Sequence, residues 1–388
     1  MELLPAVPLA AAAASGLPGV RLLRRSPGGR RARLLGGPVA TVAVDALGAD
    51  RGLAEVTAAA AEAAATGTRC LLFGPDTEVR ASLGDSAAGV DVVDAPDEIT
   101  NFDEPAQAAR ARTTASIVRA AQALGDGRAD AVVTTGPTGA ALAASLIHVK
   151  RIRGVYRPAL AVVLPVPGRR LLLLDVGANV SVRPEHLVQF TFMGAAFSTG
   201  VLGVSRPRVG LLSIGEEAGK GTEEVVAAHE RLAVLPAEIP FEFAGNAEGF
   251  DLAAGELDVV VTDGFTGNVA LKTLEGTAKT IVGAIRAAIR SGTVSKLGGL
   301  LVRHKLTPLR ETFSQEAVAG AYLLGLRGLV VVCHGNSSRR AIANAIALAE
   351  RGAEEDVVRK TASSLAAAGA LRGSADASSV VADSVGMQ

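Results

Sequence analysis

Two polar loops contain residue types that can hold a negatively charged reaction partner. The first comprises Asp175, Gly177 and Asn179, and the second comprises Asp263, Gly264, Gly267, Asn268 and, one helical turn later, Lys272. Each loop follows an apolar run, and its glycines permit a sharp turn from strand to helix. The first helical N–H groups then face outward at the positive end of the helix dipole. We predict an anion site here; the alternative is that these polar residues only cap their helices.

Two further glycine-rich loops also follow apolar runs. One contains Thr135, Gly136, Thr138 and Gly139, and the other contains Glu216 and Lys220. In a parallel sheet, the loops at the carboxyl ends of the strands share one edge, and ligands bind at that edge. We therefore expect all four loops to lie along the same edge of one sheet.

The elements that carry these loops alternate between short apolar runs and alanine-rich segments of helical period. Strands are predicted at 42–46, 70–73, 90–94, 131–134, 160–164, 171–175, 209–214, 257–262 and 330–334, and helices include 53–65, 106–124 and 266–290. This alternation is typical of an α/β sandwich with a mostly parallel sheet. No internal repeat is evident in the sequence.

Several longer motifs occur between about residue 41 and residue 351. They are Val42-Ala-Val-Asp-Ala-Leu-Gly, Arg157-Pro-Ala-Leu, Asp175-Val-Gly-Ala-Asn, Pro207-Arg-Val-Gly-Leu-Leu, Gly215-Glu-Glu with Lys220-Gly, Gly245-Asn-Ala-Glu-Gly and Asp263-Gly-Phe-Thr-Gly-Asn-Val-Ala-Leu-Lys-Thr-Leu-Glu-Gly. Together they resemble the phosphate acyltransferase (PlsX) family of bacterial phospholipid synthesis. The resemblance is specific because several long motifs agree in the same order.

The resemblance implies an acyltransferase that moves a fatty acyl group from acyl carrier protein to inorganic phosphate. The product would be an acyl phosphate for phosphatidic acid synthesis. The implied fold is a three-layer α/β/α sandwich with a mostly parallel sheet, similar to the isocitrate/isopropylmalate dehydrogenase-like and phosphotransacetylase-like architectures. A homodimer is implied as well, and neither a cofactor nor a metal is expected.

Candidate site residues follow from this chemistry. A phosphate dianion is already ionised at neutral pH, so the reaction needs groups that place it and that stabilise developing charge on oxygen. The catalytic candidates are Asn179, Asp263, Asn268 and Lys272. The substrate-binding candidates are Asp45, Thr135, Gly136, Thr138, Gly139, Asp175, Gly177, His186, Glu216, Lys220, Asn246, Glu248, Gly264 and Gly267. Their carboxylates are expected to orient donors or bond pantetheine amides, since a carboxylate beside phosphate repels it. His186 is either a proton donor or a helix cap.

The chain departs from the family's pattern in three candidate ligand loops. Ala49, Pro137 and Ala115 stand in the places that belong to Met-Gly-Gly-Asp, Ser-Ala-Gly-Asn-Thr-Gly and Lys-x-Ser-Ser motifs in the family. Three functions therefore stay open. They are the acyl carrier protein-dependent transfer, a related enzyme such as a phosphotransacylase using acyl-coenzyme A or a decarboxylating dehydrogenase, and a non-catalytic binding homologue.

Residues 280–312 are predicted to form a projecting helical hairpin. Its apolar residues Leu297, Leu300 and Leu301 lie close in sequence to basic side chains. Apolar residues beside basic ones suit the surface of an anionic bilayer. A hairpin buried at a dimer interface is the alternative, and the resemblance allows both roles.

Composition and the chain ends give coarser expectations. Lys plus Arg and Asp plus Glu both number 39, and this neutrality argues against nucleic acid as a partner. Cys70 and Cys333 lie in apolar runs and are expected to be buried thiols, which fits a reducing cytosol. We expect a cytoplasmic protein, either free or peripheral at the inner face of the cell membrane. Residues 1–38 are interpreted as a disordered or overextended leader rather than a targeting signal, 39–351 as the enzyme domain, and 352–388 as a C-terminal helix and tail.

Overall fold

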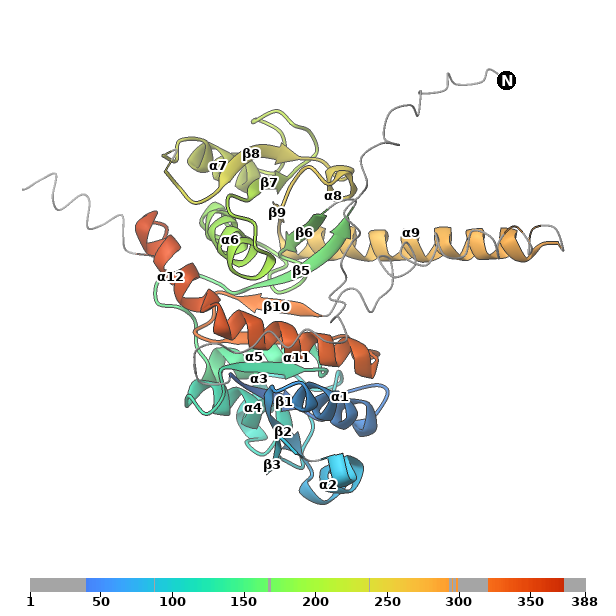
Figure 1. The fold of residues 1–388 in the computed structure, drawn as a ribbon. Helices are drawn as coiled ribbons and strands as arrows, with labels where there is room; N and C mark the ends of the chain where they lie inside the picture. The colour runs from blue at the N-terminus through green and yellow to red at the C-terminus, as the bar shows by residue number, and fades with distance from the viewer. Residues whose placement is uncertain are drawn as a thin grey trace, which may run out of the picture. The chain divides into compact units, whose positions relative to one another are not determined.

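An eleven-stranded sheet forms the centre of the fold in the described part of the chain (Figure 1). The computed structural model describes residues 40–372 except 87, 167–168, 237, 293–294, 296–297 and 299–319. The strands are β1 (Thr41–Asp45), β2 (Arg69–Gly74), β3 (Val90–Asp94), β4 (Ala131–Thr134), β5 (Ala159–Val166), β6 (Arg169–Leu174), β7 (Arg208–Leu212), β8 (Glu242–Ala247), β9 (Val259–Val261), β10 (Ala321–Leu324) and β11 (Leu329–Val332). Their order across the sheet is β3-β2-β1-β4-β11-β10-β5-β6-β9-β7-β8.

Strand direction divides the sheet into two halves. The pairs β5–β6, β10–β11 and β10–β5 are antiparallel, whereas the other neighbouring pairs are parallel. As a result, β1, β2, β4 and β11 run one way, and β6, β7, β8 and β9 run the opposite way. The expectation that all four glycine-rich loops share one edge is therefore wrong, because the loop after β4 leaves from the opposite edge.

We name the two edges by their buried aspartates. The Asp175 edge comprises the segments at the carboxyl ends of β6, β7, β8 and β9, which are residues 175–180, 213–221, 246–251 and 262–268. The Asp45 edge comprises the segments after β1, β4 and β11, which are residues 46–52, 135–137 and 333–338.

The two halves are related by an approximate twofold arrangement that was not expected from the sequence. The series β2-β1-β4-β11-β10 and β8-β7-β9-β6-β5 match position by position, with all directions reversed. The matched strands β4 and β9 lead into Val132-Val-Thr-Thr-Gly-Pro-Thr-Gly and Val260-Val-Thr-Asp-Gly-Phe-Thr-Gly. Six of these eight positions are identical, so the interpretation that no internal repeat exists is corrected.

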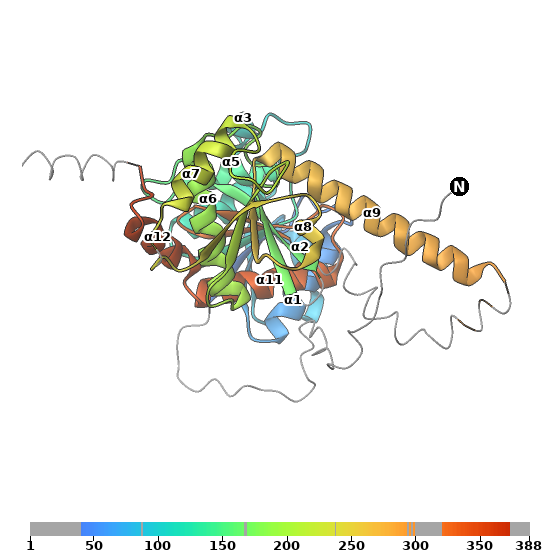
Figure 2. The same ribbon diagram turned by 90° about the horizontal axis from the view of Figure 1, so that it is seen from above.

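Helices cover both faces of the sheet, which confirms the expected three-layer sandwich (Figure 2). One face is covered by α1 (Leu53–Ala65), α2 (Asp76–Leu83), α6 (Pro184–Phe197), α7 (Glu223–Ala233), α11 (Arg339–Glu354) and α12 (Val357–Ala367). The other face is covered by α3 (Pro105–Ala111), α4 (Ser116–Gly125), α5 (Thr138–His148), α8 (Asp251–Ala254) and α9 (Gly264–Arg290). Short turns of other helix types occur at η1 (Gly84–Ser86) and η2 (Ser198–Leu202).

Side chains alternate between the two cores, as the pleat of a strand requires. Val42 and Val44 of β1 belong to the core under α1 and α11, whereas Ala43 belongs to the core under α4 and α5. Because β1 is buried on both faces, its residues form a continuous apolar run rather than an alternating pattern.

Several element boundaries differ from the expectation. The predicted helix 106–124 is two helices, α3 and α4, because the backbone leaves the helical conformation at Arg112, with a ψ of 75°, and Ala115 then forms a bridge with Asp97. The strands β8 and β10 were not predicted. Helix α11 continues to Glu354, past residue 352, where the C-terminal segment was expected to begin.

Some expectations fall on residues outside the described ranges. These are the leader 1–38 and the apolar tip formed by Leu297, Leu300 and Leu301. The described part of the hairpin region belongs mainly to α9, whose first two turns pack on the sheet and whose remainder extends away from it (Figure 1). None of the helices described by the structure is long and apolar enough to cross a membrane.

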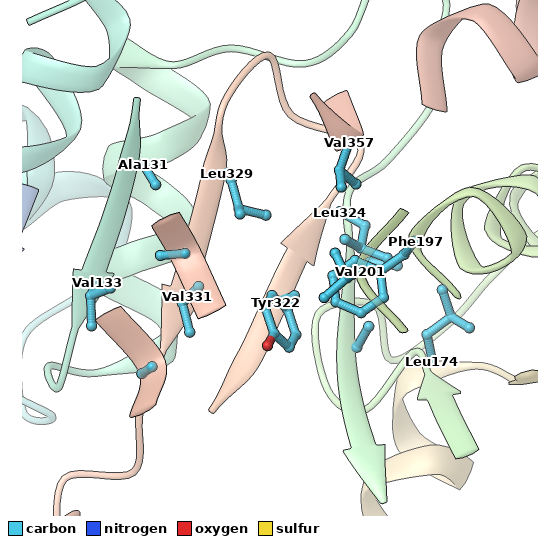
Figure 3. Close-up of a cluster of buried hydrophobic side chains, with 14 of the residues drawn as sticks. Ala131, Val133, Leu174, Phe197, Val201, Tyr322, Leu324, Leu329, Val331 and Val357 are labelled. Carbon is cyan, nitrogen blue, oxygen red and sulfur yellow. The ribbon is translucent and has the colours of Figure 1, made fainter. Parts of the chain in front are cut away.

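Tyr322 lies where the two halves of the sheet meet. Its β10 backbone pairs with Val331 of β11, and its ring centroid lies 4.5 Å from that of Phe197 on α6 (Figure 3). Its side chain is 1 % exposed, and its hydroxyl has no hydrogen-bond partner among the described residues. Burial also raises the pKa of this phenol, so the hydroxyl stays protonated.

We expect Tyr322→Phe to raise the free energy of unfolding by about 1 kcal/mol, because it removes a buried hydroxyl that has lost water without gaining a partner. Urea denaturation of both proteins measures the difference. A loss of more than about 1 kcal/mol would show that the hydroxyl is bonded in solution.

Candidate functional site

The carboxylate of Asp175 organises the loop after β6. It is fully buried, and it accepts hydrogen bonds from the Leu160 N–H at 2.9 Å, from Gly177 at 3.2 Å and from Ala178 at 3.0 Å. Asn179 donates to it twice, through its backbone N–H and its side-chain Nδ2, each at 2.7 Å. Burial raises the pKa of Asp175, and these donors oppose that shift. The carboxylate therefore acts inside the loop and orients its backbone.

Asn179 is buried by the same network. Its Nδ2 donates to the Pro158 carbonyl at 2.8 Å as well as to Asp175, so both of its amide hydrogens are used. Its own carbonyl accepts the Gly264 N–H at 2.7 Å, which joins the loop after β6 to the start of α9. The catalytic role expected of Asn179 stays a prediction, and the geometry favours a supporting function.

Two glycines allow α9 to approach this loop closely. A β-carbon at Gly264 would lie 2.7 Å from the Asn179 carbonyl oxygen, and one at Gly267 would lie 1.9 Å from the Asp175 carbonyl oxygen. Both distances are shorter than any side chain tolerates. The predicted ligand glycines Gly264 and Gly267 therefore have a packing requirement of their own, which the sequence pattern did not separate from ligand binding.

The first N–H groups of α9 are mostly used within the protein. Gly264 donates to Asn179, and Thr266 donates to the side chain of the N-cap residue Asp263 at 2.9 Å. The expected anion site was to use these outward N–H groups. The structure instead bonds the Gly264 and Thr266 N–H groups to protein acceptors, and Gly177 likewise donates to Asp175, so the anion site stays a prediction.

The side chains of Asn268 and Lys272 differ in their surroundings. Asn268 is exposed, and its amide makes no hydrogen bond with any described residue. The Lys272 ammonium pairs with Glu275 at 2.9 Å and lies 3.3 Å from Nε2 of His334, on the loop after β11. Helix α9 therefore starts at the Asp175 edge, and its third turn reaches the Asp45 edge.

The loop after β7 presents Lys220. Its carbonyl accepts from the Ser213 hydroxyl at 2.8 Å and from Asn246 Nδ2 at 3.3 Å, while its exposed ammonium has no partner among the described residues. Strands β7 and β9 are paired, with Leu211 opposite Val261, so the loops that carry Lys220 and Asn268 start from neighbouring positions.

Among the other predicted residues at this edge, Glu216 is exposed and Glu248 is half-buried. His186 is 3 % exposed, and its Nδ1 accepts the Arg183 N–H at 3.1 Å at the start of α6. Burial lowers the pKa of His186, and the charge of Arg183 lowers it further. This geometry favours the capping interpretation over that of a proton donor.

The remaining predicted residues lie at the Asp45 edge or beside it. Asp45 is buried and accepts from the Thr134 hydroxyl at 2.6 Å, and burial raises its pKa to about 6. Thr135 and Gly136 belong to the same loop, while the exposed Thr138 and Gly139 begin α5. The structure thus separates this group from Asp175, Lys220 and Asn268.

Sequence reasoning missed two histidines. His334 contacts Lys272, and His229 of α7 lies 3.0 Å from the Asn246 side-chain oxygen, Nδ1 to Oδ1. His229 belongs to no motif, whereas His334 begins His334-Gly-Asn-Ser, where the family has a His-Gly-Ser-Ser motif; only the fold brings each histidine to its partner.

Exposed apolar side chains also gather at the Asp175 edge, one on each of its four segments. They are Val180, Ile214, Phe250 and Phe265, with exposed fractions of 74, 80, 62 and 64 %. We call these four residues the apolar rim. Val180 and Phe265 directly follow predicted site residues, and Ile214 and Phe250 each lie two residues from one. These four residues are far apart in the sequence, and only the order of the strands in the sheet places their segments along one edge.

Thiol and metal chemistry receive no support from the ranges that the structure covers. Cys70 and Cys333 are buried, as expected, and burial raises the pKa of each thiol to about 12. No cluster of three or more His, Cys, Asp or Glu side chains suited to a metal occurs in the described ranges.

Known proteins share this fold. A phosphotransacetylase from Streptococcus pyogenes superposes with a TM-score of 0.57 at 16 % identity, covering 82 % of this chain and 95 % of that one. The fold is therefore that of the phosphotransacetylase-like α/β sandwiches.

Sequence comparison defines the family. The phosphate acyltransferase of Desulforudis audaxviator (strain MP104C) is 43 % identical over 320 residues, 82 % of this chain and 93 % of the relative. That of Anaeromyxobacter dehalogenans (strain 2CP-C) is 42 % identical over 339 residues, 86 % and 93 % of the two chains. The family model described as "Fatty acid synthesis protein" matches residues 40–360. The chain belongs to this family of phosphate acyltransferases, as its motifs predicted, and it is an acyltransferase.

The contact between α9 and the Asp175 loop gives a test of the site's packing. Gly267→Ala should lower the free energy of unfolding by at least about 2 kcal/mol, because its β-carbon must displace the Asp175 backbone. Gly276→Ala, in the same helix but with no atom near its β-carbon, is the matched control and should gain up to about 1 kcal/mol. Urea unfolding compares them, and equal stabilities would refute the close contact.

Proposed function

We propose that this enzyme transfers a fatty acyl group from acyl carrier protein to inorganic phosphate, and that Lys220 and Asn268 hold the reacting groups. One observation carries this proposal. Two polar side chains that have no partner among the described residues, a cation in the loop after β7 and an amide at the start of α9, follow paired strands at the Asp175 edge.

The reaction needs both kinds of group. A phosphate oxygen attacks the thioester carbonyl carbon, the carbon–sulfur bond breaks, and the thiol of the carrier leaves as a thiolate. The Lys220 ammonium attracts the phosphate dianion, and the Asn268 amide donates to the carbonyl oxygen as negative charge develops on it. Asp175 and Asn179 support these groups by fixing the start of α9. Lys272 is a weaker candidate because Glu275 already neutralises its charge.

The apolar rim supports an aliphatic acyl chain as the transferred group. Exposed apolar surface is unfavourable in water, and it is retained where a ligand or partner covers it. Val180 is adjacent to Asn179, and Phe265 is adjacent to Gly264, so the hydrogen bond between those two residues brings both apolar side chains close to the start of α9. An acyl chain lying along the rim would bring its thioester carbon to the neighbouring polar groups.

The carrier of the acyl group is the finer part of the proposal. Acyl carrier protein is proposed from the family's motifs, and acyl-coenzyme A is the competing donor. A homodimer and contact with a membrane surface through Leu297, Leu300 and Leu301 belong to the same proposal. These leucines lie outside the described residues, so the proposal for them rests on their sequence alone.

The direct test is an assay of the purified full chain with phosphate and either acyl-acyl carrier protein or acyl-coenzyme A. We expect acyl phosphate to form faster from the protein-bound donor. Lys220→Ala should raise the KM for phosphate about tenfold or more, and Asn268→Ala should lower kcat by about tenfold to a thousandfold. Lys279→Ala, an exposed lysine farther along α9, is the control and should change neither.

Other outcomes of this assay decide between the alternatives. Faster reaction with coenzyme A would make the chain a phosphotransacylase of that donor, and no product with either donor would favour a binding homologue. Full activity of both alanine variants would place the chemistry elsewhere.

The apolar rim predicts a dependence on chain length. Each added methylene of the acyl chain should improve kcat/KM by up to about fourfold, the factor equivalent to ~0.8 kcal/mol. The double variant Ile214→Ser, Phe265→Ser should flatten this dependence without changing the KM for phosphate. Val234→Ser is the matched control, because Val234 is 82 % exposed but follows the far end of α7. An unchanged dependence in the double variant would remove the rim from the acyl site.

A further inference from the structure

We propose that His229 is a positioning residue, which holds the Lys220 loop in place by fixing the side-chain amide of Asn246. The inference rests on the proposed function, in which Lys220 binds phosphate. It concerns a histidine of α7 that belongs to none of the motifs and does not itself reach the reacting groups.

The Lys220 loop is tied to Asn246 at two points. Asn246 Nδ2 donates to the Glu217 carbonyl at 2.8 Å and to the Lys220 carbonyl at 3.3 Å. The Lys220 N–H donates back to the Glu217 carbonyl at 2.9 Å, which closes the turn between these residues. The turn that ends in Lys220 is therefore held at both of its ends by one amide.

The chemistry of the partners fixes the orientation of that amide. Backbone carbonyls only accept hydrogen bonds, so the NH2 group of Asn246 must face Glu217 and Lys220. Its oxygen then faces His229, whose Nδ1 lies 3.0 Å away. His229 must donate from Nδ1, because an unprotonated Nδ1 would place two acceptors against each other. The neutral Nδ1–H tautomer and the imidazolium both supply this donor.

The position of His229 suits it to this task. Its ring is half-buried and stands edge-on to the ring of Phe243 on β8, with centroids 5.1 Å apart at 73°. Phe243 restricts rotation of the imidazole. Hydrogen bonds therefore connect His229 on α7 to Asn246 at the end of β8, and Asn246 to the backbone of Lys220 in the loop after β7.

The consequence is specific to phosphate. Lys220 is exposed and has four rotatable side-chain bonds, so the position of its backbone determines the region that its ammonium group occupies. If the Asn246 amide is free to turn, its oxygen can face the two carbonyls and repel them. The loop then shifts, and the phosphate loses its cation, while the acyl site beside β6 and α9 keeps its geometry.

Two substitutions of His229 separate the donor from the bulk of the side chain. His229→Asn places an N–H near the position of Nδ1, whereas His229→Gln moves its N–H one bond farther out. We expect the Gln variant to raise the KM for phosphate about fivefold, the equivalent of one net hydrogen bond, and the Asn variant to stay within about twofold of the parent. The KM for the acyl donor should not change in either. His229→Ala replaces the Gln variant if the latter does not fold by urea denaturation.

A double-mutant cycle tests the route through Asn246. In the Asn246→Ala background, His229→Gln should add no further increase in KM for phosphate, because the amide that it fixes is gone. Additive effects, or equal effects of the Asn and Gln variants, would overturn the proposal. Lys220→Ala distinguishes a failure of the proposed phosphate-binding function of Lys220 from a failure of the positioning role of His229. If it leaves the KM for phosphate unchanged, the proposed function of Lys220 fails; if it raises the KM and His229→Gln does not, only the positioning role fails.

Discussion

The buried carboxylate of Asp175 is the constraint on which the Asp175 edge depends. A fully buried charge is costly unless donors surround it, and five N–H groups from the start of β5 and from its own loop do so here. That network orients the Asn179 carbonyl toward the Gly264 N–H, which places the first turn of α9. Since α9 carries Asn268 and Phe265, these two side chains of the candidate site inherit their positions from one internal aspartate, whereas the Lys220 loop is tied to Asn246.

The approximate twofold arrangement shows which features are specific to the site. Strands β4 and β9 lead into nearly identical turns, yet the position after the second glycine is Ala140 in one copy and Asn268 in the other. In the first copy, helix α5 is preceded by Pro137, which has no N–H and provides no side-chain cap. In the second copy, the side chain of Asp263 caps helix α9. The same backbone motif thus occurs in both halves, and only the second copy carries the amide to which we assign a role in acyl transfer. The departure of Pro137 from the family's motif therefore lies in the half that the proposed chemistry uses less.

Sequence patterns predicted most of the fold because most strands are apolar runs bounded by glycine. They failed for β8, whose Glu242 to Ala247 sequence mixes charge, glycine and amide at the sheet's edge, and they also missed β10. They also failed for strand direction. Only two residues connect β5 to β6, and the two strands are antiparallel. This reversal of direction helps to decide which loops lie at the same edge of the sheet.

The candidate site was predictable only in part for a related reason. Aspartate, glycine and asparagine in a strand-to-helix loop look the same whether they face a ligand or bond to one another. Asp175 and Asn179 turned inward, while Asn268 and Lys220 stayed exposed. The contacts of His229 with Asn246 and of His334 with Lys272 join distant segments, which the sequence alone does not bring together.

The connection order of the two halves has a consequence for how the chain assembles. The half that contains β1, β2 and β4 is completed by β10 and β11, which are separated from β4 by the whole of the other half. During synthesis, β4 therefore has no partner on one side until almost the entire chain has left the ribosome. The second half, β5 to β9, is continuous, yet β5 likewise has no partner on one side until β10 is made. Long-range closure of this kind slows folding and extends the time during which β4 and β5 each present an unpaired strand edge, so the last two strands to be synthesised are the ones that join the two halves into one sheet.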